Sequence, residues 1–236
     1  MKVLQILPQL NIGGVERGTL DLSKALIHKG HQSFVISGGG ILVDELTQCG
    51  AKHYEIPVHI KSLRTLSLAK RLSETISSID PDIVHVRSRM PAWVNYRAFK
   101  MLQKKPLLVS TFHGLYSFPI YSKVMSFVDH SIAISKTVER YILENYKLDK
   151  DDITVIPRGC DPLEFNNEVI NPVDKANIIE EFPQIVGKKV LTIPGRITKW
   201  KGVAEFIELL SLLDDNYHGL IAVSYTHLRA HETQRY

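Results

Sequence analysis

Two positive side chains flank a short turn near the end of the chain, in residues 192–202, Thr-Ile-Pro-Gly-Arg-Ile-Thr-Lys-Trp-Lys-Gly. The turn follows an apolar pair, Val190–Leu191, and precedes a segment whose apolar residues recur at helical spacing, which predicts strand, turn and helix. Backbone N–H groups at a helix N-terminus favour an anion. Arg196 and Lys201 add two cations there, so the pattern indicates a phosphate or diphosphate site. The plainer interpretation is two solvated surface charges.

A pair of glycines, Gly13 and Gly14, follows a short apolar segment at 3–7 that is typical of a buried strand. Glycine lets a backbone approach a ligand closely, although a tight turn between strand and helix would need it equally. The spacing of Gly13, Gly14 and Gly18 is not the dinucleotide-binding G-x-G-x-x-G, which argues against a dehydrogenase. Glu16 either stabilises the first turn of the following helix or belongs to the site.

Further polar side chains stand where other predicted strands end. Arg87 and Arg89 follow the apolar segment 83–86, and His113 follows 107–111. The two arginines are suited to phosphates or carboxylates of an acceptor, or to ion pairs with surface acids. We expect His113 to take part in a site rather than to be a structural loop histidine. The aromatic segment 116–121 would line an acceptor groove, contact lipid, or simply pack.

Predicted strands alternate with predicted helices along the chain, and this order positions the polar residues. The strands fall at 3–7, 34–36, 53–56, 83–86, 107–111, 131–134 and 153–156, and the helices at about 16–28, 43–48, 66–79, 91–103 and 135–146. Such alternation predicts an α/β fold with a doubly wound, Rossmann-like parallel sheet. The polar loops would then meet at the carboxyl edge of the sheet. We expect His85, inside a strand, to lie in the core.

The pattern changes twice toward the C-terminus. Residues 1–167 form the predicted first domain, 168–187 a polar linker, and 188–222 the start of a second Rossmann-like domain. Residues 223–236 resemble the translated transposon adapter found at the ends of truncated metagenomic reading frames, and we expect them to be non-native rather than a natural polar tail. Within them, His227 and His231 have the spacing of a metal pair but lack a third ligand, so no metal site is predicted.

Composition limits the classes of function. The chain has 236 residues, of which 44% are hydrophobic and 23% charged, and a net charge of +4. This charge suits phosphate-bearing ligands or an anionic membrane surface but is too weak and dispersed to indicate nucleic acid. Two cysteines form neither a disulfide framework nor a zinc motif, and no apolar run has the length of a membrane span. We expect a cytoplasmic protein, with peripheral contact at the inner face of the membrane left open.

Five motifs in order resemble the retaining glycosyltransferases of the GT-B fold, glycosyltransferase family 4. They are Gly13-Gly-Val-Glu16, Ser110-Thr-Phe-His-Gly114, Ala133-Ile-Ser135, Val155-Ile-Pro-Arg-Gly-Cys-Asp161 and Gly195-Arg-Ile-Thr-Lys-Trp-Lys-Gly202. The resemblance covers residues 1–222. It is strongest toward enzymes that transfer sugars onto lipopolysaccharide or other bacterial envelope glycolipids.

The resemblance implies two Rossmann-like domains, one holding the acceptor and the other the nucleotide-sugar donor. Gly13 and Gly14 would approach the donor phosphates, and His113 would contact the transferred sugar near its anomeric carbon. Arg196 and Lys201 would bind the diphosphate and stabilise its charge as it leaves. The anomeric configuration would be retained, without a metal and without a cofactor other than the nucleotide-sugar substrate.

Departures from the family pattern matter for activity. The family has a pair of glutamates after the residues that match Gly202, and no equivalent follows here, so we expect a truncated and inactive chain. Arg158 stands where many members have asparagine. A non-catalytic module that binds a phosphorylated or saccharide ligand is one alternative. A different sugar-nucleotide or NAD enzyme is another, but the end of the second strand, 34–38, offers no acid for a ribose.

Overall fold

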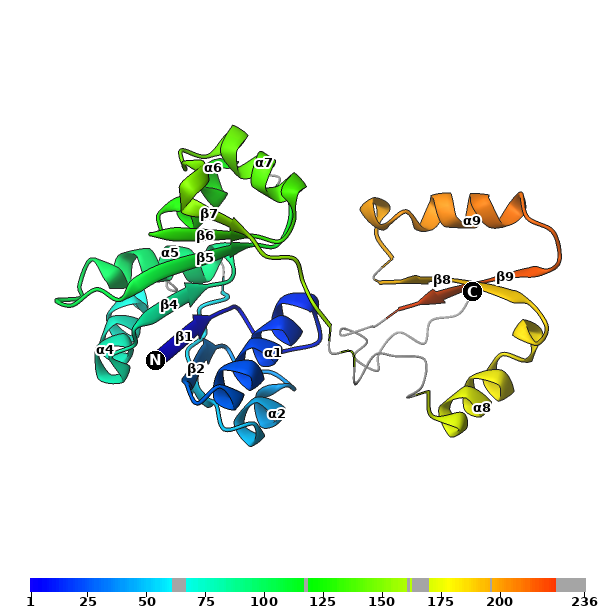
Figure 1. The fold of residues 1–236 in the computed structure, drawn as a ribbon, viewed down its shortest axis with the longest axis horizontal. Coiled ribbons are helices and arrows are strands. Elements are labelled where there is room, and N and C mark those ends of the chain that lie inside the picture. The colour runs from blue at the N-terminus through cyan, green and yellow to red at the C-terminus, as the bar shows by residue number, and fades with distance from the viewer. Residues whose placement is uncertain (61–66, 117–118, 161, 163–169, 196, 224–236) are drawn as a thin grey trace. The chain divides into compact units, whose positions relative to one another are not determined.

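The computed structural model describes residues 1–60, 67–116, 119–160, 162, 170–195 and 197–223 (Figure 1). The chain divides into two compact units, Met1–Gly159 and Cys160–Tyr236. Each contains a parallel sheet with helices, which confirms the predicted α/β class. The predicted tail lies outside the described residues apart from Val223.

The first unit is built on a seven-stranded parallel sheet in the order β3-β2-β1-β4-β5-β6-β7. The strands are β1 Lys2–Ile6, β2 Gln32–Ser37, β3 Lys52–Glu55, β4 Ile83–Val86, β5 Leu107–Phe112, β6 His130–Ala133 and β7 Ile153–Val155. All seven match predicted strands, because each is an apolar run bounded by turn residues. The order reverses direction between β1 and β4, and ligands bind outside the carboxyl ends of the strands at such a switch point.

The connecting helices are α1 Gly14–His28, α2 Val43–Gln48, α4 Ala69–Ile79, α5 Arg89–Phe99, α6 Pro119–Ser122 and α7 Lys136–Asn145, with short 3₁₀ turns η1 Lys123–Ser126 and η2 Lys150–Asp152. Helix α5 begins at Arg89 and ends at Phe99, so the predicted range 91–103 is shifted. Its last turn tightens through bonds such as Met101 N to Ala98 O at 2.9 Å, one way in which terminal carbonyls are satisfied. No helix in the described residues is long and apolar enough to cross a membrane.

Both faces of the first sheet are covered, and this explains why its strands are apolar on both sides. Figure 1 shows α1 and α2 together beside β1 and β2, away from α4 and α5. Alternate residues of β2 point to opposite faces: Val35 joins Leu20 and Leu46 in the core under α1 and α2, whereas Phe34 and Ile36 belong to the larger core under α4, α5 and α7. Because helices cover both faces of the sheet, its carboxyl edge is the place where polar loops can form a site.

The second unit contains the parallel pair β8 Lys189–Pro194 and β9 Tyr217–Ala222, joined by α9 Val203–Ser211. The predicted linker 168–187 contains a helix, α8 Pro172–Glu181, and a short turn, η3 Pro183–Ile185. Asn171 caps α8 by accepting a hydrogen bond from Val173 N at 3.0 Å, and proline at the first helical position is favourable. The polar composition of this segment thus reflects an exposed helix.

Candidate functional site

Four loops of the first unit carry the candidate site at the carboxyl edge of the sheet. Gly13 and Gly14 lie at the start of α1, Arg87 directly follows β4, and His113 directly follows β5. Arg158 follows β7 and reaches back to the glycine loop, where its Nη2 donates a hydrogen bond to the Gly14 carbonyl. The site is therefore assembled by the switch point between β1 and β4, as the order of strands predicts.

Two guanidinium groups meet over the first turns of α1. A Cβ on Gly18 would stand 2.5 Å from Arg158 Nη2 and 3.3 Å from Arg87 Nη2. The glycine at this helical position therefore leaves room for two arginines. The carboxylate of Glu16 lies over Gly13 in a similar way. The glycines of this loop therefore make room for side chains of the protein itself. This role is additional to the close approach of a ligand that the sequence predicts.

Arg87 is a buried cation with little compensation. Arg87 is 6% exposed, and its Nη1 donates a hydrogen bond to Gln5 Oε1 at 2.8 Å. Its Nε has no hydrogen-bond partner among the described residues. None of the carboxylates described here lies within ion-pair distance of Arg87 or Arg158. Burial, followed by the nearby charge of Arg158, lowers the pKa of Arg87 to about 10, because both disfavour the charged form.

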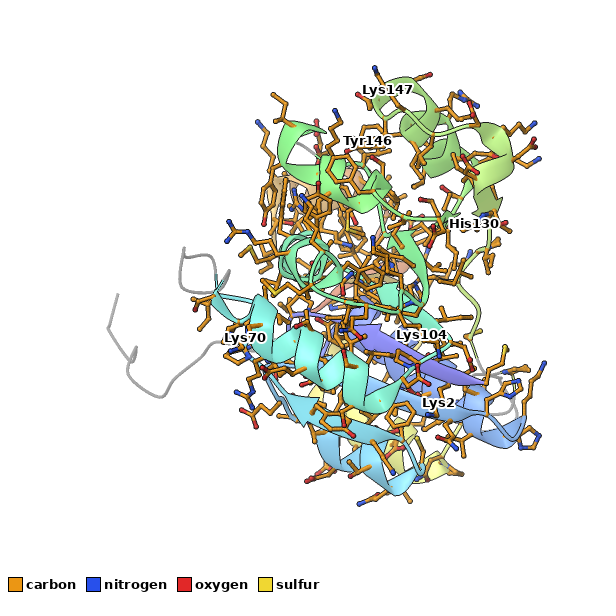
Figure 2. All side chains as sticks on the ribbon, turned by 90° about the vertical axis from the view of Figure 1, so that its left-hand side faces the viewer. Lys2, Lys70, Lys104, His130, Tyr146 and Lys147 are labelled. Atoms are coloured by element: carbon orange, nitrogen blue, oxygen red, sulfur yellow. The ribbon has the colours of Figure 1, made fainter. Side chains whose placement is uncertain are left out.

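Cations at the opposite edge of the sheet are placed differently. Lys104 Nζ lies 2.6 Å from Asp80 Oδ1, and Lys2 Nζ donates to the Ile79 carbonyl at 2.9 Å (Figure 2). Lys104 is mostly exposed, so water would satisfy it even without this partner. Arg87, by contrast, is buried and has no ion pair with a carboxylate of the described residues, although burial makes such a partner matter more.

Gln5 fixes the position of Arg87 from inside β1. Its amide is fully buried and donates to the Thr19 carbonyl at 3.1 Å and to Ser23 Oγ at 2.9 Å, so both its donor and its acceptor are used. The side chain thereby connects β1 to α1 and to the residue after β4. A hydrogen-bonded amide is tolerable at such depth, whereas an unpaired one would be costly.

The two imidazole nitrogens of His113 are both buried, and neither has a hydrogen-bond partner in the part of the chain that the structure describes. The preceding residue, Phe112, is fully buried and packs its ring against Tyr116 and Tyr146, at 5.5 and 5.4 Å between centroids, which holds the start of the loop. Burial, then the charges of Arg87 and Arg158, lowers the pKa of His113 to about 3. The ring is therefore neutral near pH 7, with one donor and one acceptor to offer.

Arg89 belongs to a different cluster from Arg87. Its guanidinium lies over the rings of Tyr116 and Tyr121, at 4.8 and 5.4 Å from their centroids, and its Nη1 lies 3.4 Å from Ser122 Oγ. Part of the aromatic segment that follows His113 is thus packed against α5. His85 is buried and bonds to Thr111 Oγ1 at 2.6 Å, which confirms its predicted place in the core.

The predicted phosphate turn in the second unit is described in part. Gly195 has φ +140°, and the Lys201 side chain folds toward it, with Nζ 3.9 Å from where a Cβ on Gly195 would stand. Gly202, at φ +73°, joins the 3₁₀ turn η4 Lys199–Lys201 to α9. Arg196 lies outside the described residues.

No group of three or more histidine, cysteine, aspartate or glutamate side chains is arranged to hold a metal ion in the part of the chain that the structure describes. The cationic side chains at the carboxyl edge of the first sheet are the main charged feature of the candidate site.

Sequence reasoning overlooked two contributors to the site, Gln5 and Gly18, and left Arg158 without a role. Gln5 is marked in the sequence as the one polar residue of an apolar strand segment. Arg158 is marked by its departure from the asparagine that many family members have. Nothing in the sequence indicates that residues so far apart would meet over Gly18.

A Rossmann-like α/β unit with a polar site at its topological switch point is the class that this fold and site define. The model of the family described as Glycosyltransferase Family 4 matches residues 12–163, which is more than half of the chain. The chain belongs to glycosyltransferase family 4.

Known proteins agree with this assignment. An uncharacterized glycosyltransferase of Methanocaldococcus jannaschii is 31% identical over 156 residues, which cover 58% of this chain and 38% of that protein. The crystal structure of a glycosyltransferase from Rickettsia africae is 36% identical, with a TM-score of 0.78, and the match covers 93% of this chain and 59% of that one. Anabaena HepE, solved with UDP and glucose, shares the fold at 17% identity and a TM-score of 0.74, over 96% and 62% of the two chains. The chain thus spans between 38% and 62% of the length of these proteins, which is less than two thirds.

Proposed function

We propose that the protein is a glycosyltransferase that moves a sugar from a nucleotide-sugar donor to a glycolipid or saccharide acceptor, with retention at the anomeric carbon. The observation that carries this proposal is the imidazole of His113, at the carboxyl edge of a family 4 sheet, whose two nitrogens have no hydrogen-bond partner among the described residues. A neutral ring of this kind is suited to sugar hydroxyls, because it both donates and accepts.

The roles of the remaining residues follow from charge. Arg196 and Lys201 bind the donor diphosphate and stabilise the negative charge that develops as it leaves. Backbone N–H groups at Gly13 and Gly14, at the N-terminus of α1, add a partial positive charge. Glu16 stabilises that same turn. With positive side chains in these places, the reaction needs no metal ion and no cofactor besides its nucleotide-sugar substrate.

We further propose a bacterial envelope glycolipid, such as lipopolysaccharide, as the source of the acceptor, and action at the cytoplasmic face of the membrane. The segment after His113 supports peripheral contact, because Leu115 and Ile120 are 61% and 90% exposed and the exposed cation Lys123 follows them in the chain. Exposed apolar side chains beside positive ones suit an anionic lipid surface.

The proposal is tested by measuring, with thermal shift and calorimetry, whether the protein binds members of a panel of nucleotide-sugars. At least one nucleotide-sugar should stabilise the protein, and Lys201→Ala should remove the shift, since the lysine supplies charge to the diphosphate. Lys175→Ala, on the exposed helix α8, is the matched control and should behave like the unmodified protein. Failure of every nucleotide-sugar to bind would contradict the proposal.

The stereochemical part has its own measurement. In a form of the protein that carries the donor-binding domain in full, slow hydrolysis of the bound donor should release a product with the anomeric configuration of the donor, as measured by proton NMR before the sugar mutarotates. An inverted product would rule out retention while leaving the assignment of a transferase intact.

A further inference from the structure

We propose that Arg87 and Arg158, together with His113, form a binding site for a phosphate group carried by the acceptor. This inference rests on the proposed function, since it specifies the chemical class of acceptor for the same transferase. It concerns a group of side chains that lies wholly within the first unit, Met1–Gly159.

The first argument is the geometry over α1. Two guanidinium groups stand over Gly18, within 3.3 Å of the point that a Cβ there would occupy. Like charges at this separation repel each other, and no carboxylate of the described residues forms an ion pair with either of them. An oxyanion bound to both would remove the repulsion, and guanidinium groups match phosphate geometry through paired N–H donors.

The second argument is the lack of compensation for a buried charge. Among the described residues, Arg87 donates a hydrogen bond to the neutral amide of Gln5, and its Nε has no partner. Glu16 and Asp21 are the acids near enough to favour its charged form, and their influence is smaller than that of burial and of Arg158. Buried charges are normally paired, so a site with unpaired cations is prepared for an anionic partner.

The third argument concerns donors that remain available. The N–H of the neutral His113 ring and Arg87 Nε are buried without a hydrogen-bond partner among the described residues, and they come from the ends of adjacent strands β5 and β4. The Arg158 side chain is exposed and, within the described part of the chain, holds the Gly14 carbonyl, so it can turn onto a ligand at little cost. A tetrahedral phosphate, with several acceptor oxygens, can use donors that arrive from three loops.

The acceptor, rather than the donor, is the source of this phosphate. The proposed function places the donor diphosphate on the cationic turn at 195–202 of the second unit. The arginines of the first unit form a second set of cations, in loops that end by residue 158. We take two sets of cations to indicate two anions, so that the acceptor is charged as well. Its phosphate belongs either to a lipid headgroup or to a soluble sugar phosphate, and the chemistry of recognition is the same.

The test measures binding of glycerol 3-phosphate by calorimetry at fixed ionic strength, with glycerol as the uncharged control. Arg158→Gln should weaken binding about tenfold, because a charge-assisted hydrogen bond is lost from a residue whose removal leaves the core intact. Arg140→Gln, an exposed arginine on α7, is the matched control and should bind as the unmodified protein does. Equal binding by the Arg158 and Arg140 variants would overturn the inference.

A second variant leaves every charge in place. Gly18→Ala introduces a methyl group where the two guanidinium groups meet, so it should weaken glycerol 3-phosphate binding while the protein remains folded, since alanine favours a helix. A folded Gly18→Ala protein with unchanged affinity would contradict the site. Sedimentation with phosphatidylcholine vesicles, with and without phosphatidylglycerol, distinguishes the two sources: binding that Arg158→Gln abolishes identifies the lipid headgroup, and soluble binding alone identifies a sugar phosphate.

UDP serves as the probe for the donor. Arg158→Gln should leave UDP affinity unchanged, and a parallel loss of UDP and glycerol 3-phosphate binding would show that the arginines serve the donor. If glycerol 3-phosphate binds but no member of the nucleotide-sugar panel does, the proposed function fails while the anion site stands, because the donor and glycerol 3-phosphate use different residues.

Discussion

Arg87 Nη1 donates a 2.8 Å hydrogen bond to Gln5 Oε1, which joins the residue after β4 to the centre of β1. The bond crosses the topological switch point of the sheet, where β1 and β4 are neighbours. A neutral amide positions the buried cation without neutralising it. Arg87 therefore keeps its charge for a ligand, and this distinguishes the pair from an ordinary internal ion pair.

Removal of this acceptor should be costly. Gln5→Leu leaves Arg87 Nη1 buried without a partner, and we expect a loss of about 2 kcal/mol in the free energy of unfolding. In Gln5→Leu combined with Arg87→Met, both partners are gone, so the total loss should be smaller than the sum of the single losses. Urea unfolding measures all three. Gln48→Leu, at an exposed position of α2, should change stability by less than about 0.5 kcal/mol.

His113 should make the protein less stable in acid. Its pKa is about 3 in the folded chain, against an ordinary value near 6.5. As pH falls below about 6.5, the unfolded chain takes up a proton that the folded chain refuses, so stability falls by at most about 1.4 kcal/mol per pH unit until pH nears 3. His85, also buried with a lowered pKa, adds to the slope.

The variant His113→Gln isolates the contribution of His113 to this slope. It should flatten the fall in stability between pH 6.5 and 4 as measured by urea unfolding, while the part due to His85 persists. Arg158→Gln should raise the pKa of His113, since it removes one of the charges that lower it. An NMR titration of His113 with a midpoint near 6.5 in the unmodified protein would contradict its burial among cations.

The two neighbouring arginines should respond differently to replacement by lysine. Arg87→Lys loses the fork that spans Gln5 and the ligand, so glycerol 3-phosphate should bind about tenfold more weakly. Arg89→Lys loses stacking on Tyr116 and Tyr121, at about 0.5–1 kcal/mol of stability, and should leave phosphate affinity unchanged. Calorimetry and urea unfolding measure the two effects. A loss of phosphate affinity in Arg89→Lys would assign that arginine to the acceptor site as well.

Gly202 should be required for the turn before α9. Its φ of +73° is unfavourable for an L side chain, so Gly202→Ala should destabilise the second unit by about 1 kcal/mol. Gly202→Asn should lose less, because asparagine tolerates this conformation. Hydrogen exchange of the β8 and β9 amides measures the effect. Equal protection in the alanine variant would show that the turn adopts another conformation.

Much of the fold could be predicted from the sequence because the strands are distinct apolar runs separated by turn residues. Strands such as 83–86 and 107–111 lie within a residue of their predicted ends, and α7 begins next to Ser135, which caps it by accepting a hydrogen bond from Val138 N at 3.2 Å. Helix α8 was predicted only as a polar linker, because an exposed helix lacks the apolar periodicity on which such predictions depend.

The candidate site could be predicted only in part. Residues at strand ends, such as Gly13, Arg87 and His113, are recognisable because a parallel sheet gathers those ends at one edge. The neighbours of Arg87 could not be recognised in the sequence. Gln5 and Arg158 are far from it along the chain and come close to it only after the sheet has formed. The sequence also does not indicate that Arg87 and Arg89 belong to different clusters. Their separation depends on packing, because α5 begins at Arg89 and Arg87 lies in the loop before it.

Position 18 carries no side chain, yet it limits what two distant positions can hold. If the space over Gly18 exists for the arginines, any relative with a larger residue at this position cannot keep Arg158 where it lies here. Positions 18 and 158 should therefore change together when homologous sequences are aligned. A glycine in the second turn of α1 paired with an arginine after β7 would then be a sequence marker for relatives that accept phosphorylated sugars or lipids.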